Sequence, residues 1–97
     1  PSERVYEDDK MIVIRDVAPA APVHVLMIPK AHTENIITAE PELLLYMFGK
    51  VKELAEKLGV NEKGFRIVAN TGDDGGQTVK HLHIHLLGGK ALGWPPC

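Results

Sequence analysis

The chain has 97 residues, of which 44% are hydrophobic and 25% are charged. This length predicts one domain, residues 1–97, with a single modest core. The net charge of -2 gives no general attraction to nucleic acid or membrane, so phosphate recognition would require a local site. There is no apolar run that could span a bilayer or act as a secretion signal, and the only cysteine, Cys97, has no internal partner. We therefore expect a cytoplasmic protein.

The first part of the chain is predicted to form strands. Polar residues between two apolar segments indicate a β-hairpin over residues 4–15. After a proline-containing loop, residues 23–28 form the next predicted strand. A short helix is expected after His32, with Thr33 as its N-cap.

One long helix is predicted over residues 41–58. Pro41 suits the first helical turn, and Gly59 suits the residue that ends the helix. Apolar side chains recur at spacings of four and three, which is typical of one helix face. This predicted core stripe consists of Leu44, Phe48, Val51, Ala55 and Leu58, and Met47 and Leu54 widen it on one flank.

Two further strands are predicted after the helix, over residues 64–70 and 81–87. The loop between them, residues 71–78, is rich in glycine and small polar side chains. One long helix and four or five strands in hairpin-like succession indicate an α+β fold. The sheet is expected to be antiparallel, because helices and strands do not alternate along the chain.

His81, His83 and His85 occupy alternate positions of the last predicted strand. Residues two apart on a strand share a face, so the three imidazoles are expected on one side and the intervening apolar residues in the core. A row of imidazoles beside a glycine-rich loop suggests a site that holds an anion and acts on it.

Three roles can explain this histidine row. A neutral imidazole can attack phosphorus and form a phosphohistidine-type intermediate, while flanking histidines bind phosphate oxygens or carry protons. A His-x-His pair on a strand also suits zinc, and upstream Asp73 and Asp74 leave that role open, although no acidic or histidine ligand follows the row. A purely structural role, which is the favoured interpretation for a single histidine, is a minority interpretation for three on one face.

Several other polar residues have an ordinary structural interpretation when each is taken alone. His24 lies within a predicted strand and is interpreted as a hydrogen-bonded structural histidine, and His32 as a loop histidine. Asp16 and Asn70 are by default turn residues. Their functional alternatives are a ribose contact for Asp16 and a sugar or phosphate contact for Asn70.

Residues 81–87 match the pattern His-φ-His-φ-His-φ-φ, where φ is apolar, at every position. In this the chain resembles the histidine triad (HIT) superfamily. Further segments occur in the order typical of its Hint branch, the histidine triad nucleotide-binding proteins. These segments are Ile-Pro-Lys-x-His at 28–32, Asp-Gly-Gly-Gln-Thr at 74–78, Leu-Gly-Gly at 87–89 and Trp-Pro-Pro at 94–96.

The resemblance implies a five-stranded antiparallel sheet with one long and one short helix, usually in a symmetric homodimer and without cofactor or metal. It implies a purine nucleoside phosphoramidate hydrolase that releases AMP or GMP through a covalent nucleotidyl-histidine. His83 would be the nucleophile. The other implied catalytic residues are His85, His81, His32 and Thr78. The implied nucleotide-binding residues are Asp16, Val17, Asn70, Gly76, Gln77, Thr78, His83 and His85. Alternatives are a nucleotide-binding regulatory protein with incidental turnover and, less favoured, a zinc-binding module.

Overall fold

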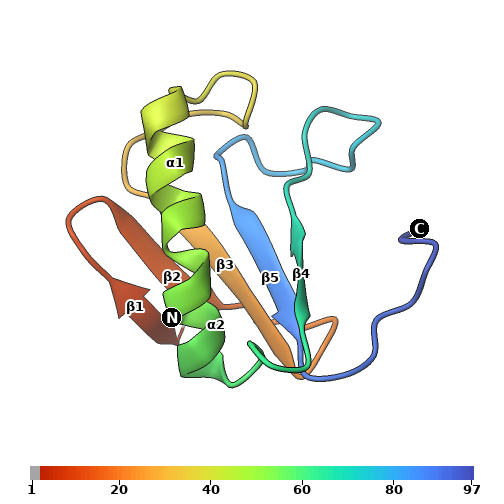
Figure 1. The fold of residues 1–97 in the computed structure, drawn as a ribbon. Helices are drawn as coiled ribbons and strands as arrows, with labels where there is room; N and C mark the ends of the chain where they lie inside the picture. Colours follow the sequence, from red (N-terminus) through yellow and green to blue (C-terminus); the bar gives the residue numbers. More distant parts are fainter. Residues whose placement is uncertain (1–2) are drawn as a thin grey trace.

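The computed structural model describes residues 3–97, so the first two residues of the predicted domain lie outside it. Its elements are β1 (Arg4–Glu7), β2 (Met11–Arg15), β3 (Val23–Pro29), α1 (Pro41–Gly49), α2 (Val51–Leu58), β4 (Phe65–Val68) and β5 (Ile84–Gly88). The strands form one antiparallel five-stranded sheet in the order β1-β2-β3-β5-β4. The helices lie across one face of this sheet (Figure 1). The predicted α+β class and its antiparallel sheet are confirmed.

The core lies between the helices and the sheet face that they cover. Alternate side chains of the central strands, such as Val25, Met27, Ile84 and Leu86, are completely buried there. The other face carries half-buried aliphatic side chains and the histidines, because successive strand residues point to opposite faces. In the part of the chain that the structure describes, no helix has the length and apolar character needed to cross a membrane.

The strand that carries the histidines begins later than predicted. β5 covers Ile84–Gly88, so His81 and His83 precede the ladder and only His85 lies within it. Neighbouring β3 ends at Pro29, which has no N–H group with which to extend the pairing. Burial nevertheless alternates through the whole motif, since the intervening apolar residues are buried. The expected shared face is confirmed for the rings of His83 and His85, whose centroids lie 5.2 Å apart.

The short helix predicted after His32 is wrong, because residues 34–39 form bends and a turn. In this segment, side-chain oxygens accept hydrogen bonds from backbone N–H groups. The Asn35 carboxamide oxygen accepts from the N–H groups of Ile37 and Thr38, and the Thr38 hydroxyl accepts from those of Glu34 and Asn35. Such local side-chain bonds compete with helical bonds and close the segment as a turn.

The predicted long helix is divided at Lys50 into α1 and α2. Both predicted ends are confirmed, with Pro41 in the first turn and Gly59 in the left-handed conformation (φ 74°) that ends the second helix. At the division, the N–H of Lys50 donates to the carbonyl of Met47, three residues back, at 3.1 Å. This tighter bond follows Gly49, whose low helix propensity makes it a natural place for a break.

The buried side chains of the two helices confirm the predicted stripe at all positions except Phe48. Met47, Leu54 and Ala55 are buried, whereas Phe48, in the middle of the predicted stripe, is 46% exposed. Leu44, Val51 and Leu58 of the predicted stripe are partly buried and pack against the core, so the stripe continues through both helices despite the division at Lys50. Of the predicted stripe, only Phe48 stays at the surface.

Candidate active site

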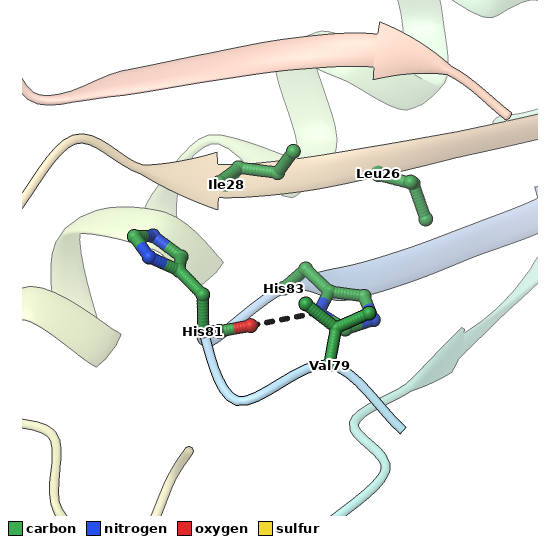
Figure 2. Close-up of a pocket in the computed structure, with 5 residues that line it drawn as sticks. All are labelled: Leu26, Ile28, Val79, His81 and His83. Atoms are coloured by element: carbon green, nitrogen blue, oxygen red, sulfur yellow. Dashed lines mark hydrogen bonds between the residues drawn. The ribbon is translucent and has the colours of Figure 1, made fainter. Parts of the chain in front are cut away.

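The ring of His83 is held by the backbone of its own motif. Its Nδ1 lies 2.8 Å from the carbonyl oxygen of His81, as the dashed line in Figure 2 shows. A carbonyl oxygen can only accept, so Nδ1 of His83 carries the proton and donates it. The neutral ring therefore keeps its lone pair on Nε2. Nucleophilic attack by an imidazole requires such a lone pair, and the half-buried ring of His83 provides it on Nε2.

His85 is held in the opposite tautomer by His24. The backbone N–H of Ala20 donates to Nδ1 of His24 at 3.0 Å, so the proton of neutral His24 lies on Nε2. That Nε2–H donates to Nδ1 of His85, at 2.9 Å. His85 then carries its own proton on Nε2. It can donate a hydrogen bond there, whereas His83 presents a lone pair.

Burial and neighbouring charge keep His85 neutral. Burial of its side chain is the main cause that lowers the pKa of His85, because burial disfavours the charged imidazolium. Positive charge on His83 or His24 would lower this pKa further, while the carboxylate of Asp16 acts in the opposite direction. His85 is therefore neutral at neutral pH and carries its proton on Nε2.

A hollow of about 300 Å³ lies directly beside His83. Its other walls are Leu26 and Ile28 of β3, Val79 and His81 (Figure 2). The hollow is therefore mostly apolar, with imidazole groups at one side. Its apolar walls suit a planar, weakly polar part of a ligand, and its imidazole side suits a charged group attached to that part.

His81 and His32 form a second pair of hydrogen-bonded rings. Nε2 of His81 lies 2.9 Å from the carbonyl oxygen of Pro29, to which it donates, so Nδ1 of neutral His81 is an acceptor. Nδ1 of His32 lies 3.0 Å from that atom and donates to it. His32 thus contacts the first histidine of the row, at the end away from the His24–His85 pair.

The glycine-rich loop is held by its own hydrogen bonds. The N–H of Gly76 donates to Asp73, and the N–H of Gln77 donates to Gly72, each at 3.0 Å. The carboxamide of Asn70 donates to the carbonyl of Gly75 at 2.7 Å. The backbone N–H groups of Gly76 and Gln77, two residues that the resemblance assigns to nucleotide binding, therefore already donate to carbonyl groups within the loop. No hydrogen bond of the Thr78 hydroxyl occurs among residues 3–97, and Thr78 is exposed.

Asp16 joins a turn to the histidine pair. One carboxylate oxygen accepts from the N–H of Ala18 at 2.8 Å, and the other lies 3.5 Å from Nε2 of His24. The turn-capping role is thus present together with a contact to the site. Val17, the predicted neighbour of the base, is 84% exposed.

One group of side chains in the described part of the chain brings three metal-ligating atoms together. Single ligand atoms of Asp16, His24 and His85 lie within 4.8 Å of one another. Metal binding by Nε2 of His24 would move its proton to Nδ1, against the N–H of Ala20. The backbone therefore opposes a metal ion here, and Asp73 and Asp74 do not belong to this group.

His24 and Asn35 are two residues of this region that sequence reasoning did not assign to it. His24 is hydrogen-bonded, as expected of a structural histidine, but its partner is His85, 61 residues away. Its position on the same strand face as Leu26 gives a signal only once β3 is known to pair with β5. Asn35 binds Gln77, 42 residues away, and no motif in the sequence marks it.

Fold and site together define a small α+β protein with a row of imidazole groups at the end of an antiparallel sheet. A family model described as HIT domain matches residues 1–92. The chain therefore belongs to the HIT family.

Related proteins agree with this assignment along nearly the whole chain. An uncharacterised HIT-like protein of Synechococcus elongatus is 54% identical over 99 residues, which cover 99% of this chain and 86% of the relative. The crystal structure of a HIT family hydrolase from Legionella pneumophila matches with a TM-score of 0.95 and 42% identity, over 100% of this chain and 89% of that one. A histidine triad nucleotide-binding protein from Candida albicans matches with a TM-score of 0.83 and 31% identity, over 98% and 75%.

Proposed function

We propose that this protein hydrolyses purine nucleoside 5′-phosphoramidates through a covalent nucleotidyl-histidine on Nε2 of His83. The observation that carries the proposal is the hydrogen bond from Nδ1 of His83 to the carbonyl of His81, which leaves Nε2 unprotonated. The names of two matched proteins, a HIT family hydrolase and a nucleotide-binding protein, support the same class of chemistry.

The reaction consists of two displacements at phosphorus. Nε2 of His83 attacks the α-phosphorus, the P–N bond to the leaving amine breaks, and the amine nitrogen takes a proton. Nε2–H of His85 and the hydroxyl of Thr78 are the proposed donors to the phosphoryl oxygens and the leaving nitrogen. Water then attacks phosphorus and returns a proton to the group that protonated the amine, the bond from phosphorus to Nε2 of His83 breaks, and the nucleoside monophosphate leaves.

The nucleoside is assigned to the surroundings of this phosphate position. The apolar hollow beside His83 suits a purine base, and Asp16 suits the ribose hydroxyls, with Val17 and Asn70 as further contacts. Gly76 and Gln77 hold the phosphate side of the site by shaping the loop that carries Thr78. His81 and His32 complete the proposed proton network.

The test is steady-state turnover of adenosine 5′-phosphoramidate, followed by a rapid quench without acid and mass spectrometry of the peptide that contains residues 81–87. We expect AMP release and a nucleotide adduct on His83. His83→Asn keeps a donor toward the carbonyl of His81 but removes the nucleophile, so turnover should fall by roughly a thousandfold or more. Affinity for AMP should change far less, which shows that the variant is folded.

Other outcomes would favour the alternatives. An adduct on another histidine, or turnover that survives in His83→Asn, contradicts the proposed mechanism. Tight binding of AMP without turnover by the wild-type protein favours a regulatory nucleotide-binding protein. Loss of turnover on treatment with a chelator, restored by zinc alone, favours the metal-dependent reading.

We also propose that the protein is a homodimer and acts in the cytoplasm. Dimerisation is supported by the exposed aromatic side chains of Phe48 and Phe65 beside the edge strand β4. The cytoplasmic assignment is supported by the single cysteine, Cys97, which is exposed and free.

A further inference from the structure

A buried pair of carboxamides joins the glycine-rich loop to the turn after β3. Asn35 is 8% exposed and Gln77 is 7% exposed. The Nδ2 of Asn35 donates to Oε1 of Gln77 at 3.2 Å, between segments that are 42 residues apart. Buried polar groups of this kind are stable only when their hydrogen bonds are made.

The side chain of Gln77 makes all four hydrogen bonds that a carboxamide can make. Its Oε1 accepts from Asn35 and from the N–H of Gly72, at 3.2 and 3.0 Å. Its Nε2 donates to the carbonyls of Glu34 and Val79, at 2.8 and 3.0 Å. A carboxamide has two acceptor lone pairs and two N–H groups, so no capacity remains for a ligand.

These partners permit only one orientation of the Gln77 amide. If the amide turned over, Nε2 would face the donors of Asn35 and Gly72, and Oε1 would face the carbonyls of Glu34 and Val79. All four contacts would then oppose like groups. Unpaired buried polar groups cost about 1–3 kcal/mol each, so this flip is strongly disfavoured.

The fixed amide determines where the chain runs beside the histidine row. The bond from Gln77 to the carbonyl of Val79 spans Thr78, and Val79 lines the hollow beside His83. On the other side, Gln77 is bonded twice to Gly72, once through its backbone and once through its side chain. The position of Thr78 is thereby set from both sides.

We propose that Asn35 is a positioning residue, which holds Gln77 in one orientation and so places Thr78 and Val79 for the reaction at His83. This role rests on the proposed function. Asn35 does not touch the reacting atoms; it acts through Gln77. The ribose contact assigned to Asp16 lies outside this network, but Val79 lines the hollow assigned to the base, so losing Asn35 should lower kcat strongly and raise KM to a smaller extent.

The diagnostic variant is Asn35→Asp, which keeps the shape of the side chain but replaces the donor toward Gln77 with an acceptor. At pH 7.5 we expect kcat for adenosine 5′-phosphoramidate to fall between about tenfold and a hundredfold, with KM changed less than about threefold. At lower pH the carboxyl becomes protonated and regains a donor. The ratio of variant to wild-type kcat should therefore rise as the pH falls. Asn61→Asp, the same change at an exposed asparagine far from Gln77 in the sequence, is the matched control. Because Asn61 lines the hollow beside β4 that is proposed to bind a second copy, sedimentation velocity first establishes that this control has the oligomeric state of wild type, and its kcat and KM should then match those of wild type.

A second measurement needs no nucleotide. The N–H of Gly72 donates to Oε1 of Gln77, so its hydrogen exchange, followed by NMR, reports on the network. In Asn35→Asp this exchange should be at least about tenfold faster, while core amides such as that of Met27 keep their protection. Asn61→Asp should leave the exchange of Gly72 unchanged.

The outcomes separate this proposal from the proposed function. If the wild-type protein does not hydrolyse the phosphoramidate, the proposed function fails, and the exchange of Gly72 alone decides whether Asn35 holds the loop. Unchanged exchange of Gly72, or an effect confined to KM, overturns the positioning role. Should Asn35→Asp fail to fold, Asn35→Ala introduces no charge and is judged by the same two measurements.

Discussion

His83 and His85 lie two residues apart, yet they present different nitrogens in different protonation states. The carbonyl of His81 fixes the proton of His83 on Nδ1, and the N–H of Ala20, acting through His24, fixes that of His85 on Nε2. Backbone groups cannot exchange the roles of donor and acceptor, so they determine the tautomers of the side chains. A lone pair and a donor are consequently presented by neighbouring rings, as a displacement at phosphorus requires.

The lowered pKa of His85 predicts how stability depends on pH. The main cause of this shift is burial of the His85 side chain. In the folded protein His85 therefore takes up its proton at a lower pH than in the unfolded chain, where its pKa keeps the ordinary value of about 6.5. Between these two values the unfolded state binds more protons, and the free energy of unfolding rises with pH. The stabilising contribution is complete above about pH 6.5 and is lost as the pH falls through the folded-state pKa of His85.

Urea unfolding at several pH values between 5 and 8 measures this dependence. His85→Gln, which has no titrating group at this position, should show a smaller loss of stability on acidification than wild type. An NMR titration of the wild-type protein should find His85 titrating below 6.5. Equal pH slopes for the two proteins would contradict this account.

At the level of the elements, glycines occur both where a side chain has room and where it has none. A Cβ on Gly49, at the end of α1, would meet no atom within 4 Å. A Cβ on Gly75 would collide with the backbone of Thr71, inside the loop before β5. The first glycine weakens a helix, whereas the second permits two segments of the loop to approach closely.

Alanine substitution at these two glycines should have opposite effects. Gly49→Ala should raise the free energy of unfolding by about 0.5–1 kcal/mol, because alanine favours helix and meets no obstacle. Gly75→Ala should lower it by roughly 1–3 kcal/mol, because the loop has to move. Urea unfolding of both variants provides the measurement, and a shift of the same sign in both would refute the steric argument.

At the scale of the whole molecule, the sheet ends in two unpaired edges, β1 and β4. Beside β4 lies a hollow of about 530 Å³ that is partly lined by Phe48, Val51, Ala55 and Phe65. Phe48 and Phe65 are 46% and 36% exposed. An edge strand beside exposed aromatic side chains is a surface that a second copy of the chain can cover.

Charge placed on this surface should separate the proposed dimer. Phe48→Lys combined with Phe65→Lys should yield monomers in sedimentation velocity, at concentrations where the wild-type protein is a dimer. Ile37→Lys, a change at a residue that is 79% exposed, should leave the dimer intact. A monomeric wild-type protein at micromolar concentration, or a dimer that survives the double substitution, would argue against this interface.

Local patterns in the sequence determined much of this protein. The hairpin, the ends of the helical segment at Pro41 and Gly59, and the alternation that turns His83 and His85 away from the core all follow from short-range rules. Each depends on residues a few positions apart, whose geometry the backbone fixes. The short helix expected after His32 failed because Asn35 and Thr38 bind the local backbone, a competition that helical pattern alone does not reveal.

Only the tertiary structure decided what surrounds the histidine row. The insertion of β5 between β3 and β4 brings His24 to His85 across 61 residues, and the packing of two loops brings Asn35 to Gln77 across 42. Neither contact follows from sequence spacing, because it depends on which strands pair and in which register. The sequence thus specified the imidazole groups and, through the nearby carbonyl of His81, the tautomer of His83, whereas long-range packing against His24 determined which nitrogen of His85 carries the proton.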